Sequence, residues 1–339
     1  MQKMILALMA LVAGCMSTTA QEAGDGSRRP SVGVEYSGEV QTDFKSARMA
    51  NLLQLQADIP LSRTVMFQAA SLSALSTDRE LDLLDLQGFS NIDTHERSIA
   101  LALKVAGFTW QLNRHSLFAG IRRTDEDYFC SDGLGIFTNS SCGIFPTISA
   151  NFDIGTFPCA ALGIHYAYDQ ENLRLQASLY NGEGNYRFSG RKNIFRFCPQ
   201  SDGVFALAQV EYRHRDSHYF LGASIHTEPT VKSTAWAYAE QCLSPRLMLL
   251  AAYGHAFGRD NSCDNFCALG GKYTVDRAEF GLFTDYARVQ GLDEWTTELV
   301  CSIPLTGFLA LQPALHVITT DGTTNCVALL RVNVSIGGR

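Results

Sequence analysis

The sequence lacks a long apolar run and an excess of basic residues. Its longest apolar stretch, residues 4–13, is about half of the ~20 residues that a helix needs to cross hydrocarbon. Lys and Arg number 27 against 34 Asp and Glu, which gives a net charge of −7. Proteins that bind nucleic acid need a basic face to displace counterions from phosphates. We therefore expect neither a helical membrane anchor nor a nucleic-acid partner.

Familiar catalytic and metal-binding motifs are also missing. GxSxG, HExxH and Walker A patterns do not occur, and the GGK tripeptide at 270–272 is followed by Tyr273 instead of Ser or Thr. The CxxxC pair at 263–267 has no nearby His to complete a zinc site. We predict no enzyme, no metal and no cofactor. The alternative is a hydrolase that pairs a Ser with one of three histidines on predicted inward faces: His165, His226 and His316.

The N-terminus has the features of an export signal. Lys3 supplies a positive start, residues 4–13 the apolar stretch, and Thr18 and Ala20 the small residues before cleavage. We predict a signal peptide over 1–20 and a short periplasmic segment over 21–30. The alternative is lipoprotein processing, with Cys15 acylated.

Cysteine is the one unusual component of the mature chain. Nine of the ten cysteines lie beyond residue 20, an odd number for an exported protein, so at least one is expected to be a free thiol or to pair with another chain. Cys130 and Cys142 flank one predicted loop. They could form a disulfide bridge or remain two free thiols, and the sequence leaves both alternatives open. No recognisable disulfide framework is present.

Period-two alternation of apolar and polar residues is the dominant pattern, as in 173–181, and it places successive side chains on opposite faces of a strand. Helical spacing is nowhere sustained. Tyr and Trp side chains, including Tyr36, Tyr212 and Trp236, lie near predicted strand ends, as in the aromatic girdles of membrane barrels. The pattern predicts sixteen strands, at 31–42, 51–59, 65–75, 98–106, 116–124, 160–168, 173–181, 203–212, 218–226, 233–242, 247–256, 266–274, 278–287, 294–303, 308–318 and 325–336.

The predicted connections alternate between short and longer segments. Those at 76–97, 125–159 and 182–202 are far longer than the rest. Short turns on one rim and long loops on the other are typical of outer-membrane barrels, and an even strand number leaves both termini on the short-turn side. We therefore predict an all-β fold over 31–339: a transmembrane antiparallel β-barrel with short periplasmic turns and long extracellular loops. A soluble sandwich or propeller is the alternative.

The longest predicted loop, 125–159, carries few charges after Asp132 and is rich in Gly, Ser, Asn and Phe. We expect it to fold into the bore and narrow it, with aromatic faces such as Phe137 and amide groups turned to sugar rings and hydroxyls. A loop exposed on the surface is the alternative. Charged residues predicted on the inward faces have mixed signs, which suits selectivity for passing solutes: Glu35, Lys104, Arg122, Arg174, Glu211, Lys272, Asp285, Glu298 and Arg331.

Four segments resemble the carbohydrate-selective porin family of Gram-negative outer membranes: DLQGFSNID at 85–93, IFTNSSCG at 136–143, LYNGEG at 179–184, and EWTTELVCSIPLTGFLALQPALHVITTDGT at 294–323. The resemblance implies a sixteen-stranded barrel whose inward loop and charged wall residues form a sugar-preferring constriction. It places Asn139, Ser140 and Ser141 in that loop, and Arg122 and Arg123 on the adjacent wall. The chain departs from the family in its many cysteines and in ending without a terminal aromatic residue.

These observations together predict an outer-membrane porin, a passive channel for small carbohydrates and ions that contacts outer-membrane lipid. A general porin without sugar preference and a barrel hydrolase are the alternatives. Whether the barrel is a monomer or forms a homo-oligomer such as a trimer stays open. The residues expected to form the constriction and contact solute are Arg122, Arg123, Phe137, Asn139, Ser140, Ser141, Arg174, Glu211 and Glu298.

Overall fold

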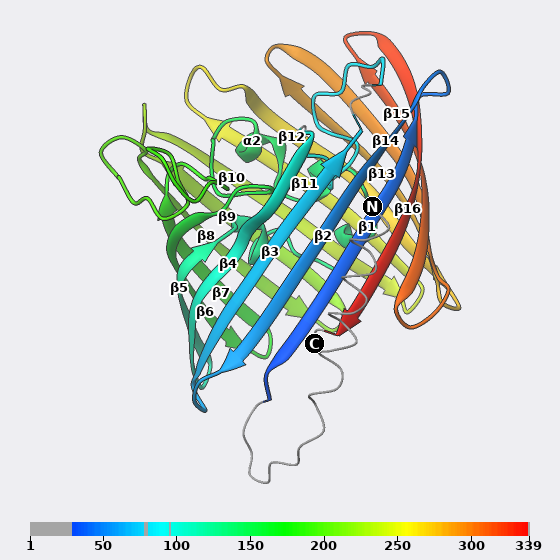
Figure 1. Ribbon diagram of the computed structural model, residues 1–339. Coiled ribbons are helices and arrows are strands. Elements are labelled where there is room, and N and C mark those ends of the chain that lie inside the picture. The colour runs from blue at the N-terminus through cyan, green and yellow to red at the C-terminus, as the bar shows by residue number, and fades with distance from the viewer. Residues whose placement is uncertain (1–28, 78–80, 95, 338–339) are drawn as a thin grey trace.

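Sixteen antiparallel strands form a closed barrel in which each strand pairs with its neighbours in the chain and β1 pairs with β16 (Figure 1). The computed structural model describes residues 29–77, 81–94 and 96–337. The predicted signal peptide, Cys15 and most of the segment 21–30 lie outside these residues. The strands are β1 Ser31–Thr42, β2 Ala47–Pro60, β3 Val65–Ser76, β4 Ser98–Leu112, β5 His115–Arg122, β6 Ala161–Gln170, β7 Leu173–Asn181, β8 Val204–His214, β9 Ser217–His226, β10 Lys232–Ser244, β11 Leu247–Phe257, β12 Cys263–Val275, β13 Ala278–Val289, β14 Leu292–Pro304, β15 Leu309–Thr320 and β16 Thr323–Gly337.

The alternating sequence pattern matches two faces of one wall. In β9, Leu221 and Ile225 are exposed on the outer face, while Phe220, Ser224 and His226 are buried on the inner face. This alternation runs around the barrel, so all sixteen predicted strands are confirmed, with shifted ends such as the extension of β4 to Leu112. A sandwich or propeller is excluded because the sheet closes on itself.

The two rims differ less regularly than the sequence predicts. One rim, here called the turn rim, carries the connections 61–64, 113–114, 171–172, 215–216, 245–246, 276–277 and 305–308, together with the start of β1 and the end of β16. The opposite loop rim carries the three predicted long loops, now bounded at 77–97, 123–160 and 182–203. Its other connections, such as 290–291 and 321–322, have only two to five residues, close to the two to four of the turn rim, so the strict alternation of short and long connections was wrong.

The outer surface of the barrel is apolar. Exposed side chains there include Leu221, Leu269 and Leu282, each more than half exposed, and Tyr212 lies among them. Trp236 was wrongly assigned to an aromatic girdle, because its side chain points inward and is buried in the lumen. Within the described part of the chain, no helix has the length and apolar character needed to cross a membrane.

The nine cysteines of the predicted mature chain are all free thiols. Cys130 is exposed and Cys142 is buried, so the open question of a bridge between them is answered against it. Cys142 lies in the apolar cluster that fills part of the lumen, where a thiol acts as a small apolar side chain.

Candidate functional site

The connection 123–160, here called the inner loop, folds into the lumen, as its composition predicts. It contains three short 3-10 helices, η1 Thr124–Glu126, η2 Leu134–Ile136 and η3 Ser140–Cys142, and one α-helical turn, α2 Pro146–Ser149. Asn139 begins η3 by accepting a hydrogen bond from the backbone N–H of Ser141 at 2.9 Å. Pro146 begins α2, where its missing N–H costs no helical bond.

Aromatic packing holds the inner loop against one half of the wall. The ring of Phe129 lies 5.1 Å from Trp236 of β10, and Phe145 lies 4.8 Å from Phe266 of β12, measured between ring centroids. Burying one such side chain contributes roughly 1.5–3 kcal/mol. The inward faces of β8–β16 supply most of this apolar cluster and are here called the packed side. This half of the lumen wall is therefore largely apolar.

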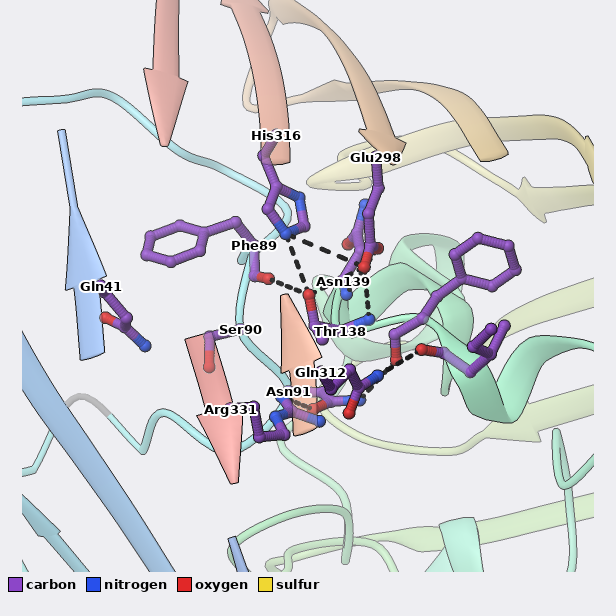
Figure 2. A network of polar contacts seen from close by, with 12 residues as sticks. Gln41, Phe89, Ser90, Asn91, Thr138, Asn139, Glu298, Gln312, His316 and Arg331 are labelled. Atoms are coloured by element: carbon purple, nitrogen blue, oxygen red, sulfur yellow. Dashed lines mark hydrogen bonds and ion pairs between the residues drawn. The ribbon is translucent and has the colours of Figure 1, made fainter. Parts of the chain in front are cut away.

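A buried carboxylate fixes the tip of the inner loop to the packed side (Figure 2). Glu298 of β14 accepts hydrogen bonds from the backbone N–H of Thr138 at 2.8 Å, the hydroxyl of Thr138 at 2.9 Å and the backbone N–H of Asn139 at 3.1 Å. His316 Nε2 lies 2.9 Å from the same hydroxyl, and the Asn139 amide donates to Asp285 at 2.8 Å. A buried carboxylate is tolerated when donors surround it in this way.

The loop 77–97 closes over the same contact from the loop rim. The backbone N–H groups of residues 86 and 87 donate to Glu294 at 2.8 and 3.0 Å, and the N–H of Asn91 donates to the carbonyl of Thr138 at 2.7 Å. Arg331 donates to Asn91 Oδ1 at 2.7 Å and forms an ion pair with Glu39. The two loops thus occlude the packed side together.

The remaining opening lies along the inward faces of β1–β5 and beside the last residues of β16, here together called the open side. It includes a cavity of about 340 Å³ that begins near the turn rim and reaches the first residues of the inner loop. Its lining is mostly polar and carries both signs of charge: Glu35, Gln56, Asp58, Gln68, Ala69, Ala70, Lys104, Val105, Arg122, Glu126, Ser335 and Gly337.

Paired charges line the inner end of this opening. The guanidinium of Arg122 donates from Nε and Nη2 to the two carboxylate oxygens of Asp127, each at 2.6 Å. The other N–H groups of this guanidinium do not bind Asp127. Lys104 Nζ lies 3.2 Å from Glu126. Burial raises the pKa of Glu126, but Arg123 and Lys104 outweigh burial and hold this pKa below its ordinary value. Glu126 is therefore ionised at neutral pH.

Most loop residues expected to contact solute are turned to the wall or to the loop 77–97 instead. Phe137 packs on Phe283 with ring centroids 5.0 Å apart, and Ser141 donates to Gln87 at 2.9 Å. Phe137, Asn139 and Ser141 are each at most 1% exposed, whereas Ser140 is half-buried. This corrects the expectation that the aromatic and amide groups of the loop face the bore. The packed side binds them because it offers both apolar surface and Glu298.

Besides Glu298, the expected arginine and glutamate positions separate into three places. Arg122 lines the cavity of the open side, while Arg123 is buried and pairs with Asp125 at 2.9 Å. Arg174 and Glu211 are register partners of β7 and β8 near the turn rim. There Arg174 lies 3.8 Å from Asp169, and Glu211 is 3.0 Å from Arg213 and 2.7 Å from His218. The nine residues predicted to form the constriction therefore do not form one cluster.

A Ser, a His and an Asp come together beside Arg122. Ser178 Oγ lies 2.7 Å from His165 Nδ1, and His165 Nε2 lies 3.6 Å from Asp127. The hydroxyl of Tyr128 lies 2.9 Å from Ser178 Oγ, and Asp127 is already held by Arg122. All these groups are largely buried, whereas a nucleophile needs space about 3 Å away for the reacting atom. The cluster anchors the start of the inner loop.

Sequence reasoning missed the loop residues that make these contacts. Glu126 and Asp127 follow Arg122 and Arg123 within five positions, so the run RRTDED at 122–127 is a signal for paired charges at the wall. Thr138 gives no such signal, because its partner Glu298 lies 160 residues away in the chain.

No family model matches the chain, and no curated protein matches it in sequence. Solved structures match in fold. OprB of Pseudomonas putida at high pH is 16% identical over 91% of this chain and 94% of its own, with a TM-score of 0.76. The low-pH structure of that protein covers 91% and 93%, also at 16% identity, with a TM-score of 0.62. An anion-selective porin from Comamonas acidovorans is 10% identical over 91% and 99%, with a TM-score of 0.62. These likenesses confirm the sixteen-stranded porin fold.

Proposed function

We propose that the chain is an outer-membrane porin, a passive diffusion channel for small hydrophilic solutes. The observation that carries this proposal is a closed barrel whose longest loop occludes one side of the lumen and leaves a polar cavity of mixed charge along the other. An apolar outer surface places such a barrel in a membrane, and the porin fold of its structural neighbours supports the outer membrane.

Small carbohydrates are the proposed preferred solutes. The segments that resemble carbohydrate-selective porins support this, as does the chemistry of the open side. The side chains of Gln56, Gln68 and Arg122 supply neutral and charged hydrogen-bonding groups at the cavity, and the Arg122 N–H groups beyond the two that bind Asp127 can donate to sugar hydroxyls. Because the loop aromatics are buried in the packed side, sugar contacts would be hydrogen bonds to the wall and not ring stacking.

A general porin is the second candidate, and the burial of Phe137 and Asn139 favours it because it removes the expected sugar platform. The two candidates differ in planar bilayers. Purified protein should conduct ions in both cases, but only a sugar-preferring channel loses ion current in a graded way with a panel of mono- and oligosaccharides. Current that no sugar reduces would support the general porin, and no conductance at all would contradict both.

We do not propose a hydrolase. Ser178 is covered by Tyr128, and Asp127, which lies beside His165, is bound by Arg122. A direct check is available. The parent and Ser178→Ala barrels should show the same background rate on short-chain esters. A rate that is lost in Ser178→Ala would favour the hydrolase alternative.

A further inference from the structure

The connection 182–203, here called the outer loop, reaches the outside of the barrel at Ile194, while its Tyr186 packs toward the inward cluster of β2–β4. Ile194 is 2% exposed and packs against Ile121 and Ala160, with the partly buried side chains of Leu103, Ala106 and Leu162 around them. Ile121 faces outward, because Phe118 and Arg122 of the same strand point into the lumen and its register partners are Ala106 and Leu162. In Figure 1 the green loop between β7 and β8 accordingly extends past the rim.

Three phenylalanine rings stand out from this loop into the surroundings. Phe188, Phe195 and Phe197 are 50%, 55% and 45% exposed, and the first two rings lie 6.3 Å apart. Phe195 directly follows Ile194, which is pressed against the outer wall. Exposed apolar groups gathered in one place mark a surface that contacts apolar material. Their position at the edge of an apolar wall corresponds to the level where acyl chains meet headgroups.

The same loop is basic, although the whole chain carries a net charge of −7. Residues 184–201 contain three Arg and one Lys and no acidic residue. Lys192 pairs with Glu183 at 2.6 Å and Arg196 with Asp202 at 3.0 Å. Arg187 and Arg191 have no ion pair among the residues that the structure describes. The loop therefore presents two uncompensated guanidinium groups beside its exposed rings.

We infer that the outer loop binds the phosphate groups of an outer-leaflet glycolipid of the lipid A type, with its phenylalanine rings against the acyl chains. This inference rests on the outer-membrane location in the proposed function. Guanidinium groups match the geometry of phosphate oxygens, and basic side chains near a membrane surface are attracted to anionic headgroups. The loop lies on the long-loop rim, which faces the exterior in porin-like barrels. One molecule with phosphates above acyl chains satisfies both halves of the surface.

The test measures binding of bis-phosphorylated lipid A to the full barrel in detergent by native mass spectrometry. We expect the double variant Arg187→Ala with Arg191→Ala to weaken binding about tenfold. The matched control is Arg246→Ala with Arg277→Ala, which removes two exposed arginines from the turn rim and should bind as the parent does. Phe195→Ser with Phe197→Ser should also weaken binding, because the acyl contact is lost.

Several results would overturn the inference. Unchanged binding in the double arginine variant would do so, as would an equal loss in the turn-rim control, since that shows a general charge effect. Dephosphorylated lipid A should bind the parent more weakly. Equal binding of the two lipids would show that the outer loop does not bind the phosphate groups. If inorganic phosphate displaces lipid A at equal concentration, the loop is a free-anion site instead. Bilayer conductance of the same preparations reports on the channel separately, so loss of lipid binding with intact conductance refutes only this inference.

Discussion

The two halves of the lumen share one strand pattern but differ in what their inward faces carry. On the packed side, β8–β16 turn rings such as Trp236, Phe266 and Phe283 inward, and the inner loop covers them. On the open side, β1–β5 turn Glu35, Gln56 and other polar groups inward toward the turn rim, and a cavity remains there. Alternation alone therefore fixes that a residue faces the lumen, while its chemistry decides whether that part of the wall binds the loop or contacts water.

Both sides also contain buried or half-buried charges, and these have different partners. Glu298 on the packed side is satisfied by backbone and hydroxyl donors of the inner loop, so it fixes the position of the loop. Arg122 and Lys104 on the open side pair with acids at the start of that loop and still line the cavity. The same kind of residue thus serves loop attachment on one side and solute contact on the other.

The largest expected effect comes from a hole in the packed side. Phe145→Ala removes a fully buried ring that contacts Phe266, and core truncations of this size cost about 3–5 kcal/mol. We expect the inner loop to detach, with higher single-channel conductance and faster hydrogen exchange in 123–160. The control Phe108→Ala alters an exposed ring on the outer wall and should leave conductance unchanged. Parent-like conductance in Phe145→Ala would show that aromatic packing does not hold the loop.

The next effect concerns the polar attachment. Glu298→Ala leaves the N–H groups of Thr138 and Asn139 without their acceptor, at about 1–3 kcal/mol for each buried donor. Conductance should rise and the size limit for sugars in liposome swelling should increase. Glu298→Gln keeps one acceptor oxygen and should lie between Ala and the parent. Glu211→Ala is the matched control, because this wall carboxylate is bound by Arg213 and His218, and an equal rise there would contradict a specific role for Glu298.

Much of this arrangement follows from local sequence, but its central contacts do not. Alternation predicts the strands, and the weakly charged, Phe-rich segment after Asp132 predicts an inward loop. Neither predicts which wall the loop covers, because the pairs Thr138–Glu298 and Phe129–Trp236 join residues far apart in the chain. Apolar residues at inward positions of β8–β16 were a usable signal. In these strands the residues on the outer face are also apolar. The sequence alone therefore does not show which of the two apolar sets faces the lumen.

A smaller effect is expected on the open side. Arg122→Ala removes a positive charge beside the cavity and leaves Asp127 without its bidentate partner. Reversal potentials in a salt gradient should shift toward cations, by about two- to fivefold in permeability ratio, and sugar block should weaken. Arg122→Lys keeps the charge but not the fork, so it should restore ion selectivity more than sugar block. Parent-like selectivity and block in Arg122→Ala would assign solute contact to another wall.

The smallest effect is a pH dependence at the inner loop. Because Arg123 and Lys104 lower the pKa of Glu126 below its ordinary value of 4.5, ionised Glu126 stabilises the loop above that pH, and this contribution is lost as pH falls through the lower, folded pKa. The contribution of Glu126 to selectivity should therefore change little between about pH 8 and 5, and its loss should shift selectivity toward anions only below 4.5. Glu126→Gln should remove this acid step. A step near neutral pH that Glu126→Gln abolishes would contradict the assignment.

The central claim is that solutes pass along the open side and not the packed side, and thiol accessibility tests it most directly. Gln56→Cys places a thiol on the cavity lining, and Ala268→Cys places one on a buried inward position of β12. Each channel is recorded in a planar bilayer while a charged, water-soluble thiol reagent is added, with the parent setting the background from its own cysteines. We predict a stepwise loss of current in Gln56→Cys and none beyond background in Ala268→Cys. Block of Ala268→Cys with an unaffected Gln56→Cys would contradict the account.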